Sequence, residues 1–375
     1  MKKFIPLLIV CILMTGCVEK KYIEKLGIVT TIGFDLLDDG FLQGTMAFFQ
    51  FDPNAQNVSQ IVTSTAKTSK GIRQDGNLKS SKKLVSGQLR LVVFGRKAAE
   101  KGLGRIIDTL ARDAAISDIL YLTVAEDRAQ DIIQSNKMED APDIGAYLHG
   151  LIEKNIDDEV LPPSTLHHFT HDFHDVGLDP TLPMLGLSDN KPVIFHLALF
   201  QGDQFVTEIP VKQGFYLKLI LDRFQAGHLE LKLPKDPFLP HLRGRVNEDV
   251  EGVYITMDEI RSKSNITLTD PNALKYKVDI RLSTRIIEIS EDIKLQERKV
   301  LKLMEEQLSK QLEENLKEFT ELIIENKVDP VGFGRMYENS SRNIELTEKK
   351  WREMIPNIEV DFNVNAKILR HGIIK

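Results

Sequence analysis

Cysteine is almost absent from this chain, which holds only Cys11 and Cys17 among 375 residues. A framework of disulfides, the usual brace of small secreted domains, is therefore excluded. Tryptophan occurs once, and beyond the N-terminal stretch no apolar run is long enough to cross a bilayer about 30 Å thick. Stability must come from packed hydrophobic cores, and the length predicts two or three domains.

Neither positive nor negative charge is in large excess. The net charge is −6, with 42% hydrophobic and 28% charged residues, as in ordinary globular proteins. An acidic body is a poor partner for nucleic acid and gains nothing overall from anionic lipid, so we expect no nucleic-acid partner. Loss of residues 1–16, which contain two lysines, would change the net charge to −8.

Motifs for catalysis are missing as well. The chain has no Gly-x-Ser-x-Gly sequence, and Gly102-x-Gly104 lies within a helical pattern rather than between a strand and a helix. The paired carboxylates Asp38-Asp39 and Asp157-Asp158 lie in hydrophilic, turn-like surroundings that do not raise a pKa for acid–base work. We therefore expect a protein that is not an enzyme and binds no cofactor.

The N-terminus, in contrast, carries a specific signal. A basic start, Lys2-Lys3, precedes the apolar stretch Phe4–Met14 and two small residues directly before Cys17. This is the lipobox arrangement of bacterial lipoproteins, in which Cys17 receives a diacylglyceryl group and becomes the new N-terminus. We expect residues 1–16 to be a signal peptide, residues 17–22 a lipidated tether, and the mature protein to be anchored on the extracytoplasmic side of a membrane. The alternative is an ordinary secretory peptide with an incidental cysteine.

Four of the nine histidines lie together in the segment 166–175. Imidazole and carboxylate groups at this density can hold zinc or another divalent cation. The spacing matches no helical metal pair at i and i+4 with an acid between, and no cysteine contributes. We therefore favour an exposed polar loop between domains and assign no metal site. A site within 167–174 is the alternative.

The first half of the chain alternates strand and helix patterns irregularly. The polar stretch 55–83 is predicted as one helix, and the Pro- and Gly-rich stretch 140–192 as a long irregular connection. The other elements expected in this half are strands over 27–35, 42–51, 89–94 and 119–125, and helices over 97–112 and 131–134.

The second half contains the clearest elements. Apolar residues recur in steps of three or four over 293–324, which predicts a long amphipathic helix. Strict alternation over 358–368 predicts a half-exposed strand, whose sheet the helix should cover. Asp329-Pro330 joins a helix-cap residue to a proline suited to a first helical position. A hairpin over 192–209 and a helix over 211–224 precede these elements.

These patterns predict an α+β protein with mixed or antiparallel sheets, packed helices and one long amphipathic helix in its C-terminal half. After the signal peptide and tether, we expect an N-terminal α/β region over 23–190, which can divide into two sub-domains. A C-terminal α+β domain is expected over 191–375.

Several blocks, taken together and in order, resemble one family, the C subunits of spore germinant receptors or Ger(x)C lipoproteins of endospore-forming bacteria. The candidate structural or contact residues within them are Gly27, Gly33, Asp35, Gly332, Phe333 and Gly334. The blocks are the lipobox at Cys17, then 24–35, 89–95, 112–113, 119–126, 199–206, 261–263, 329–334, Trp351 and 358–372. We expect the glycines to serve tight backbone geometry. Gln88 departs from the family, in which a histidine is common.

The resemblance implies a non-enzymatic subunit built from three small α/β modules. It further implies a complex with two integral-membrane subunits in the spore inner membrane, which triggers germination in response to nutrients. This subunit would contact the bilayer through acylated Cys17 and support assembly or signalling. The alternative from another class is a solute-binding lipoprotein that delivers a ligand to a membrane transporter. Such a protein would have two similar domains around a cleft, whereas the two halves here look dissimilar.

Overall fold

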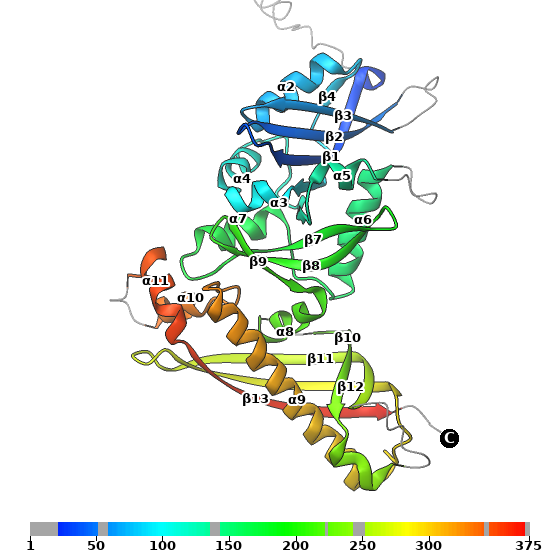
Figure 1. The fold of residues 1–375 in the computed structure, drawn as a ribbon, viewed down its shortest axis with the longest axis vertical. Coiled ribbons are helices and arrows are strands. Elements are labelled where there is room, and N and C mark those ends of the chain that lie inside the picture. The colour runs from blue at the N-terminus through cyan, green and yellow to red at the C-terminus, as the bar shows by residue number, and fades with distance from the viewer. Residues whose placement is uncertain are drawn as a thin grey trace, which may run out of the picture.

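The computed structural model describes residues 22–51, 59–135, 143–221, 224–242, 252–340 and 345–371. The predicted signal peptide and Cys17 lie outside the described residues. The molecule is elongated, with a nine-stranded mixed sheet toward its N-terminal end and a four-stranded sheet at the opposite end (Figure 1). The expected class, mixed α/β layers with mixed sheets, is confirmed.

The first sheet has the order β3-β2-β1-β5-β6-β7-β8-β9, with β4 paired to β1. Its centre, β1-β5-β6-β7, is parallel and both flanks are antiparallel. The strands are β1 (Leu26–Leu36), β2 (Leu42–Gln50), β3 (Ser59–Ala66), β4 (Lys83–Val85), β5 (Leu91–Phe94), β6 (Tyr121–Ala125), β7 (Thr181–Ser188), β8 (Lys191–Gln201) and β9 (Gln204–Pro210).

The predicted domain boundary after residue 190 falls in the tight turn between β7 and β8. The first sheet continues beyond this turn through β8 and β9, and ends at Pro210. The pairing between β6 and β7 is short, with Val124 opposite Met184 and Ala125 opposite Leu185. The two halves of this sheet are thus joined by little backbone pairing.

Helices cover both faces of the first sheet because its buried strands alternate between two cores. Leu91 and Val93 face one core, whereas Val92 and Phe94 face the other. On the first side lie α5 (Ala129–Ile133), α6 (Ile144–Asp157) and α8 (Val211–Leu221), and on the second α2 (Ser69–Lys79), α3 (Arg96–Lys101), α4 (Gly104–Ala111) and α7 (Leu166–His174).

Two sequence-based expectations in this half were wrong. The stretch predicted as one helix over 55–83 contains both β3 and α2, because β3 finds a pairing partner in β2 and Thr68 caps a new helix start. The stretch 140–192 is not an irregular connection, since it holds α6, α7 and β7. Side-chain caps from Asp143 and Thr165 start its two helices, and its prolines lie outside both of them.

The helix predicted over 97–112 is divided into α3 and α4. Gly102 ends α3 with a φ of +113°, a conformation that side chains with a Cβ rarely adopt. The strands expected over 27–35, 42–51, 89–94 and 119–125, and the hairpin over 192–209, are confirmed with end shifts of a few residues.

The second sheet has the order β10-β11-β12-β13. The long helix α9 (Arg298–Glu325) crosses one face of it (Figure 1), and the predicted apolar stripe from Val300 to Ile323 is buried there. The expectation that this helix covers the sheet of the terminal strand is confirmed. The remaining elements are β10 (Gly227–Pro234), β11 (Gly252–Asp270), β12 (Lys275–Ile289), α10 (Phe333–Asn339), α11 (Glu348–Met354) and β13 (Glu359–His371), with short 3₁₀ turns at Ile23–Lys25, Asp236–His241 and Ile355–Asn357.

Polar side chains of α9 also close the open edge of β13. The backbone N–H of Val364 donates to Glu313 Oε1 at 2.8 Å, that of Ala366 to Ser309 Oγ at 3.0 Å, and that of Ile368 to Glu305 Oε1 at 3.0 Å. An unpaired strand edge is a template for pairing with other chains. The helix therefore both covers the sheet and satisfies its edge.

Candidate functional site

The candidate residues Gly332, Phe333 and Gly334 surround one buried carboxylate, that of Asp329. Its Oδ1 accepts the N–H of Gly332 at 2.8 Å and of Phe333 at 3.1 Å. Its Oδ2 accepts the N–H of Gly334 at 2.9 Å and the indole N–H of Trp351 at 3.1 Å. Gly332 has a φ of +81° just before α10, which starts at Phe333 rather than at Pro330. The predicted cap position is therefore wrong, since the N-cap is Gly332, although the Asp329 carboxylate accepts the N–H groups at the start of this helix.

This cluster is also one of the places where the C-terminal half meets the N-terminal half, beside the hydrophobic core that they share. The N–H of Asp329 donates to Asp179 Oδ2 at 2.6 Å, and the N–H of Asp179 donates to the carbonyl of Asp329 at 2.9 Å. Arg352 binds both carboxylate oxygens of Asp179 through two guanidinium nitrogens. A Cβ on Gly334 would lie 2.5 Å from Gly177 Cα, so only glycine lets the two backbones touch. We name Gly177, Asp179, Asp329, Gly334 and Arg352 the inter-half clasp.

The electrostatics of the clasp follow from its burial. The pKa of Asp329 is raised to about 7, chiefly because the carboxyl is shut off from water. The charge of Asp179 also raises this pKa, and the backbone N–H groups that donate to Asp329 lower it. Four donors occupy the two oxygens of Asp329, and Arg352 holds Asp179. These carboxylates therefore hold structure together and are not free to exchange protons with a substrate.

The N-terminal candidates have a similar structural role. Asp35 accepts the N–H of Ala129 at 2.7 Å and of Gln130 at 2.9 Å, so it caps the start of α5. Burial raises the pKa of Asp35. A Cβ on Gly33 would lie 2.9 Å from the Cβ of Ala129, so glycine lets α5 approach β1.

Gly27 lies apart from that contact, on the opposite side of β1. A Cβ there would lie 2.8 Å from Phe48 Cδ2 and 3.0 Å from Leu84 Cδ2. The structure thus gathers the six candidates in three separate places, each a site of close packing or capping.

The histidine-rich segment is helix α7 rather than a loop. Leu166 and Phe169 bury one side of it in the core. His168 Nδ1 lies 2.7 Å from Thr165 Oγ1, and His171 Nδ1 lies 3.0 Å from Asp172 Oδ1. Among the described residues, no group of three His, Cys, Asp or Glu side chains is placed to hold a metal ion.

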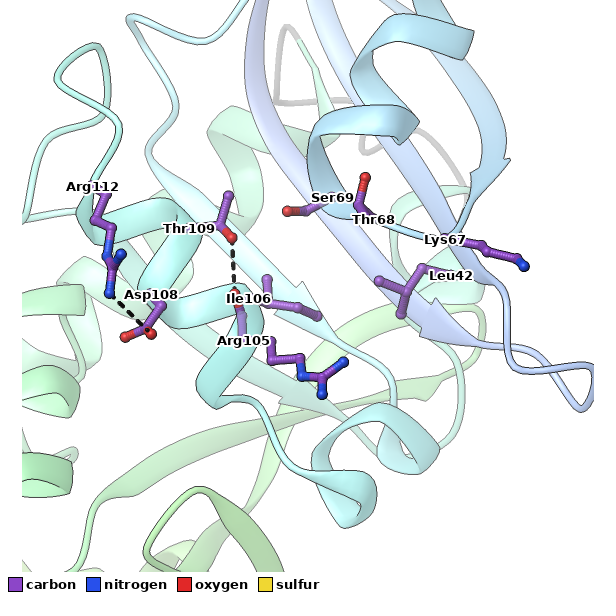
Figure 2. Close-up of a pocket in the computed structure, with 9 residues that line it drawn as sticks. All are labelled: Leu42, Lys67, Thr68, Ser69, Arg105, Ile106, Asp108, Thr109 and Arg112. Carbon is purple, nitrogen blue, oxygen red and sulfur yellow. Dashed lines mark hydrogen bonds and ion pairs between the residues drawn. The ribbon is translucent and has the colours of Figure 1, made fainter.

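Two surface hollows were not foreseen from the sequence. Figure 2 shows the residues that line one of them, between the start of α2 and α4. Its volume is about 390 Å³. Its cations are partly engaged, because Arg112 pairs with Asp108 at 3.6 Å and Lys67 lies over the ring of Phe41. A second hollow, of about 430 Å³, is lined by Ile28, Thr30, Phe49, Phe51, Gln88, Arg90, Gly145 and Ala146. Gln88, the position that departs from the family pattern, therefore lies at a hollow.

Comparison with known proteins shows which family has this architecture. The family model for the spore germination protein N-terminal domain matches residues 19–187, and that for the spore germination B3/GerAC-like C-terminal region matches residues 196–372. Spore germination protein GerQC of Bacillus cereus is 24% identical over 374 residues, covering 100% of this chain and 99% of its own. Spore germination protein KC of Bacillus subtilis (strain 168) is 23% identical and covers 98% and 95%.

The crystal structure of the GerBC protein has the same fold. It superposes with a TM-score of 0.54 at 15% identity, over 90% of this chain and 96% of that one. Two family models in succession, a full-length relative and a shared fold lead to one conclusion: this chain belongs to the spore germination GerAC family, the Ger(x)C type that its sequence resembles.

Proposed function

We propose that this chain is the lipid-anchored C-type subunit of a nutrient germinant receptor in the spore inner membrane, and that it acts through protein contacts. The observation that carries the proposal is the pair of spore-germination family matches, which together span residues 19–187 and 196–372. Its partners are two integral-membrane subunits, and its role is receptor assembly or signalling during germination.

The anchor in this proposal is Cys17. In the described part of the chain, no helix combines the length and the apolar character needed to cross a bilayer. Two or more acyl chains on Cys17 give stable attachment, and attachment raises the effective concentration of the body near its membrane partners. The lipid thus favours assembly by keeping the folded body close to its membrane partners.

A role without catalysis is supported by how the buried carboxylates are used. Asp35 caps α5, and Asp329 and Asp179 join the two halves. The clasp makes the body suited to transmit a displacement from one end to the other, because a packed junction moves as a unit. A solute-binding lipoprotein receives less support, since the two sheets of the molecule have nine and four strands and do not form two similar domains.

The first experiment measures nutrient-triggered dipicolinate release from spores that lack this gene. A parallel sample receives a trigger that bypasses nutrient receptors. We expect the response to at least one nutrient to be lost while the bypass response is kept. Normal release on a broad nutrient panel, in a strain also lacking the related receptors, would contradict the proposal.

A point variant tests the anchor. Cys17→Ala should leave the fold intact but remove the lipid, and so reduce assembly and the nutrient response by about tenfold or more. Cys11→Ala is the matched control, because it changes the other cysteine within the signal peptide. Mass spectrometry of the mature N-terminus reports lipidation, and immunoblots of membrane fractions report assembly. Wild-type assembly of Cys17→Ala would refute the anchoring mechanism.

A further inference from the structure

The N-terminal end of the molecule exposes an unusual group of large apolar side chains. They come from η1 (Ile23–Lys25) and the residue before it, from the residue after β2 and from the last turn of α2. The four are Tyr22, Ile23, Phe51 and Leu78, with exposed fractions of 56%, 52%, 50% and 87%. Single exposed apolar residues are ordinary, but four at one end of a molecule mark a contact surface.

Hydrogen bonds show that these segments share one end. Leu26 at the start of β1 pairs with Lys83 of β4, and Gly27 pairs with Gln50, which Phe51 follows. The Nζ of Lys82 donates to the carbonyl of Glu24 at 2.9 Å.

The end of α2 is tied to the same place by the residue before Leu78. Asn77 Oδ1 accepts the N–H of Leu84 in β4 at 2.8 Å. Figure 1 shows α2 and β4 together at the N-terminal end, far from the second sheet.

The same end is basic although the whole chain is acidic. Among the described residues, Lys25, Lys82 and Lys83 lie beside the apolar group together with Glu24, and Asp75 of α2 is paired with Lys79. The Nζ of Lys25 lies 5.4 Å from the centre of the Tyr22 ring. Lysines beside tyrosine and aliphatic side chains are the composition that binds the interface of an anionic membrane.

The length of the tether indicates that this surface faces the membrane. Four residues lie between Cys17 and Tyr22, which makes five steps along the chain. An extended chain spans at most about 3.5 Å per step, so Tyr22 lies within roughly 17 Å of the lipidated residue. We propose that Tyr22, Ile23, Phe51 and Leu78, with Lys25 and Lys83, form a membrane-docking end that lies on the anionic lipid surface. This rests on the proposed function for its setting. The second sheet then projects away from the membrane.

The test uses the mature chain with Cys17→Ser, so that docking is measured without the lipid. Cosedimentation is compared for vesicles of phosphatidylcholine alone and vesicles with about 30% phosphatidylglycerol. We expect binding to the anionic vesicles only. Replacing the four apolar residues by serine, or Lys25 and Lys83 by glutamine, should each weaken it by about tenfold or more.

Control variants change exposed residues elsewhere. Ile119→Ser with Phe195→Ser removes apolar surface, and Lys302→Gln with Lys310→Gln removes charge from α9. These variants should bind as the parent does, and circular dichroism verifies that all variants are folded. Equal loss in the controls, equal binding to both vesicle types, or no binding at all would overturn the proposal. No binding would assign the surface to a protein partner.

Fluorescence provides a second measurement with an internal reference. Trp351 is the only tryptophan and is fully buried in α11, so brominated lipids should not quench it. Phe51→Trp should add emission that brominated anionic vesicles quench. Absence of quenching would contradict docking through this end. Because the protein used carries no lipid, these results are independent of whether Cys17 is acylated in the spore, which mass spectrometry decides separately.

Discussion

At the scale of single residues, Asp329 is a buried carboxylate whose two oxygens are both fully engaged. Each of its oxygens accepts two N–H donors, so an amide in either orientation would turn an NH₂ group toward two of them. We expect Asp329→Asn to lower the free energy of unfolding by about 2–4 kcal/mol. Denaturant unfolding measures this effect.

Asp270→Asn is the control for that change. Asp270 uses one oxygen to accept the N–H groups of Asn272 and Ala273 in an exposed turn. Its amide can keep that oxygen in place, so the loss should stay below about 1 kcal/mol. An equal loss in both variants would show that the four-donor arrangement has no special weight.

Because the pKa of Asp329 is raised, the difference in unfolding free energy between wild type and Asp329→Asn should depend on pH. This pKa is raised from 3.8 to about 7, so the folded state binds a proton more tightly than the unfolded state does. The stabilisation from this proton is complete below about pH 4 and is lost as the pH rises toward about 7. We therefore expect wild type to exceed Asp329→Asn in stability by more near pH 4 than near pH 7. A difference that grows with pH would mean that the four N–H donors outweigh burial.

At the scale of elements, α9 protects the edge of the second sheet as well as its face. Glu305 and Glu313 accept the N–H groups of Ile368 and Val364 in β13. We expect the double variant Glu305→Ala, Glu313→Ala to lower the unfolding free energy by about 1–3 kcal/mol and to promote self-association through the free edge. Denaturation and light scattering measure these two effects.

The chain offers a matched control one residue further along α9. Glu306 and Glu314 are exposed and pair with Lys302 and Lys310 of the same helix, at 3.7 and 3.8 Å. Their replacement by alanine should change stability by less than about 1 kcal/mol and leave the protein monodisperse. Aggregation of the control pair as well would point to lost surface charge instead of an opened edge.

At the scale of the whole molecule, the clasp couples the two sheets. Arg352→Met would leave the Asp179 carboxylate buried without its cation, at a cost of about 3–5 kcal/mol. Because Asp179 and Arg352 belong to different halves, we expect calorimetry to resolve one transition in the wild type and two in this variant. Arg335→Met is the control, since its pair with Asp175 at 3.3 Å is partly exposed and contributes less than about 1 kcal/mol.

The sequence predicted the second half better than the first. The stripe over 293–324 and the alternation over 358–368 became α9 and β13, because each element buries one continuous face. The stretches 55–83 and 140–192 were misread because caps such as Thr68 and Asp143 start helices inside polar or proline-rich surroundings. Local composition does not show whether such a cap is used.

The sequence by itself determined features that depend on neighbouring residues, namely the expected lipobox at Cys17 and the strong helix and strand periods. It also determined family membership, which depends on many blocks in a fixed order. Only the tertiary structure decided what those blocks do. Asp179 and Arg352 are 173 residues apart, and Gly177 touches Gly334. Tyr22, Phe51 and Leu78 reach one end through strand pairing. A single sequence carries no record of such pairings, because they arise from the packing of distant segments rather than from the preferences of neighbouring residues.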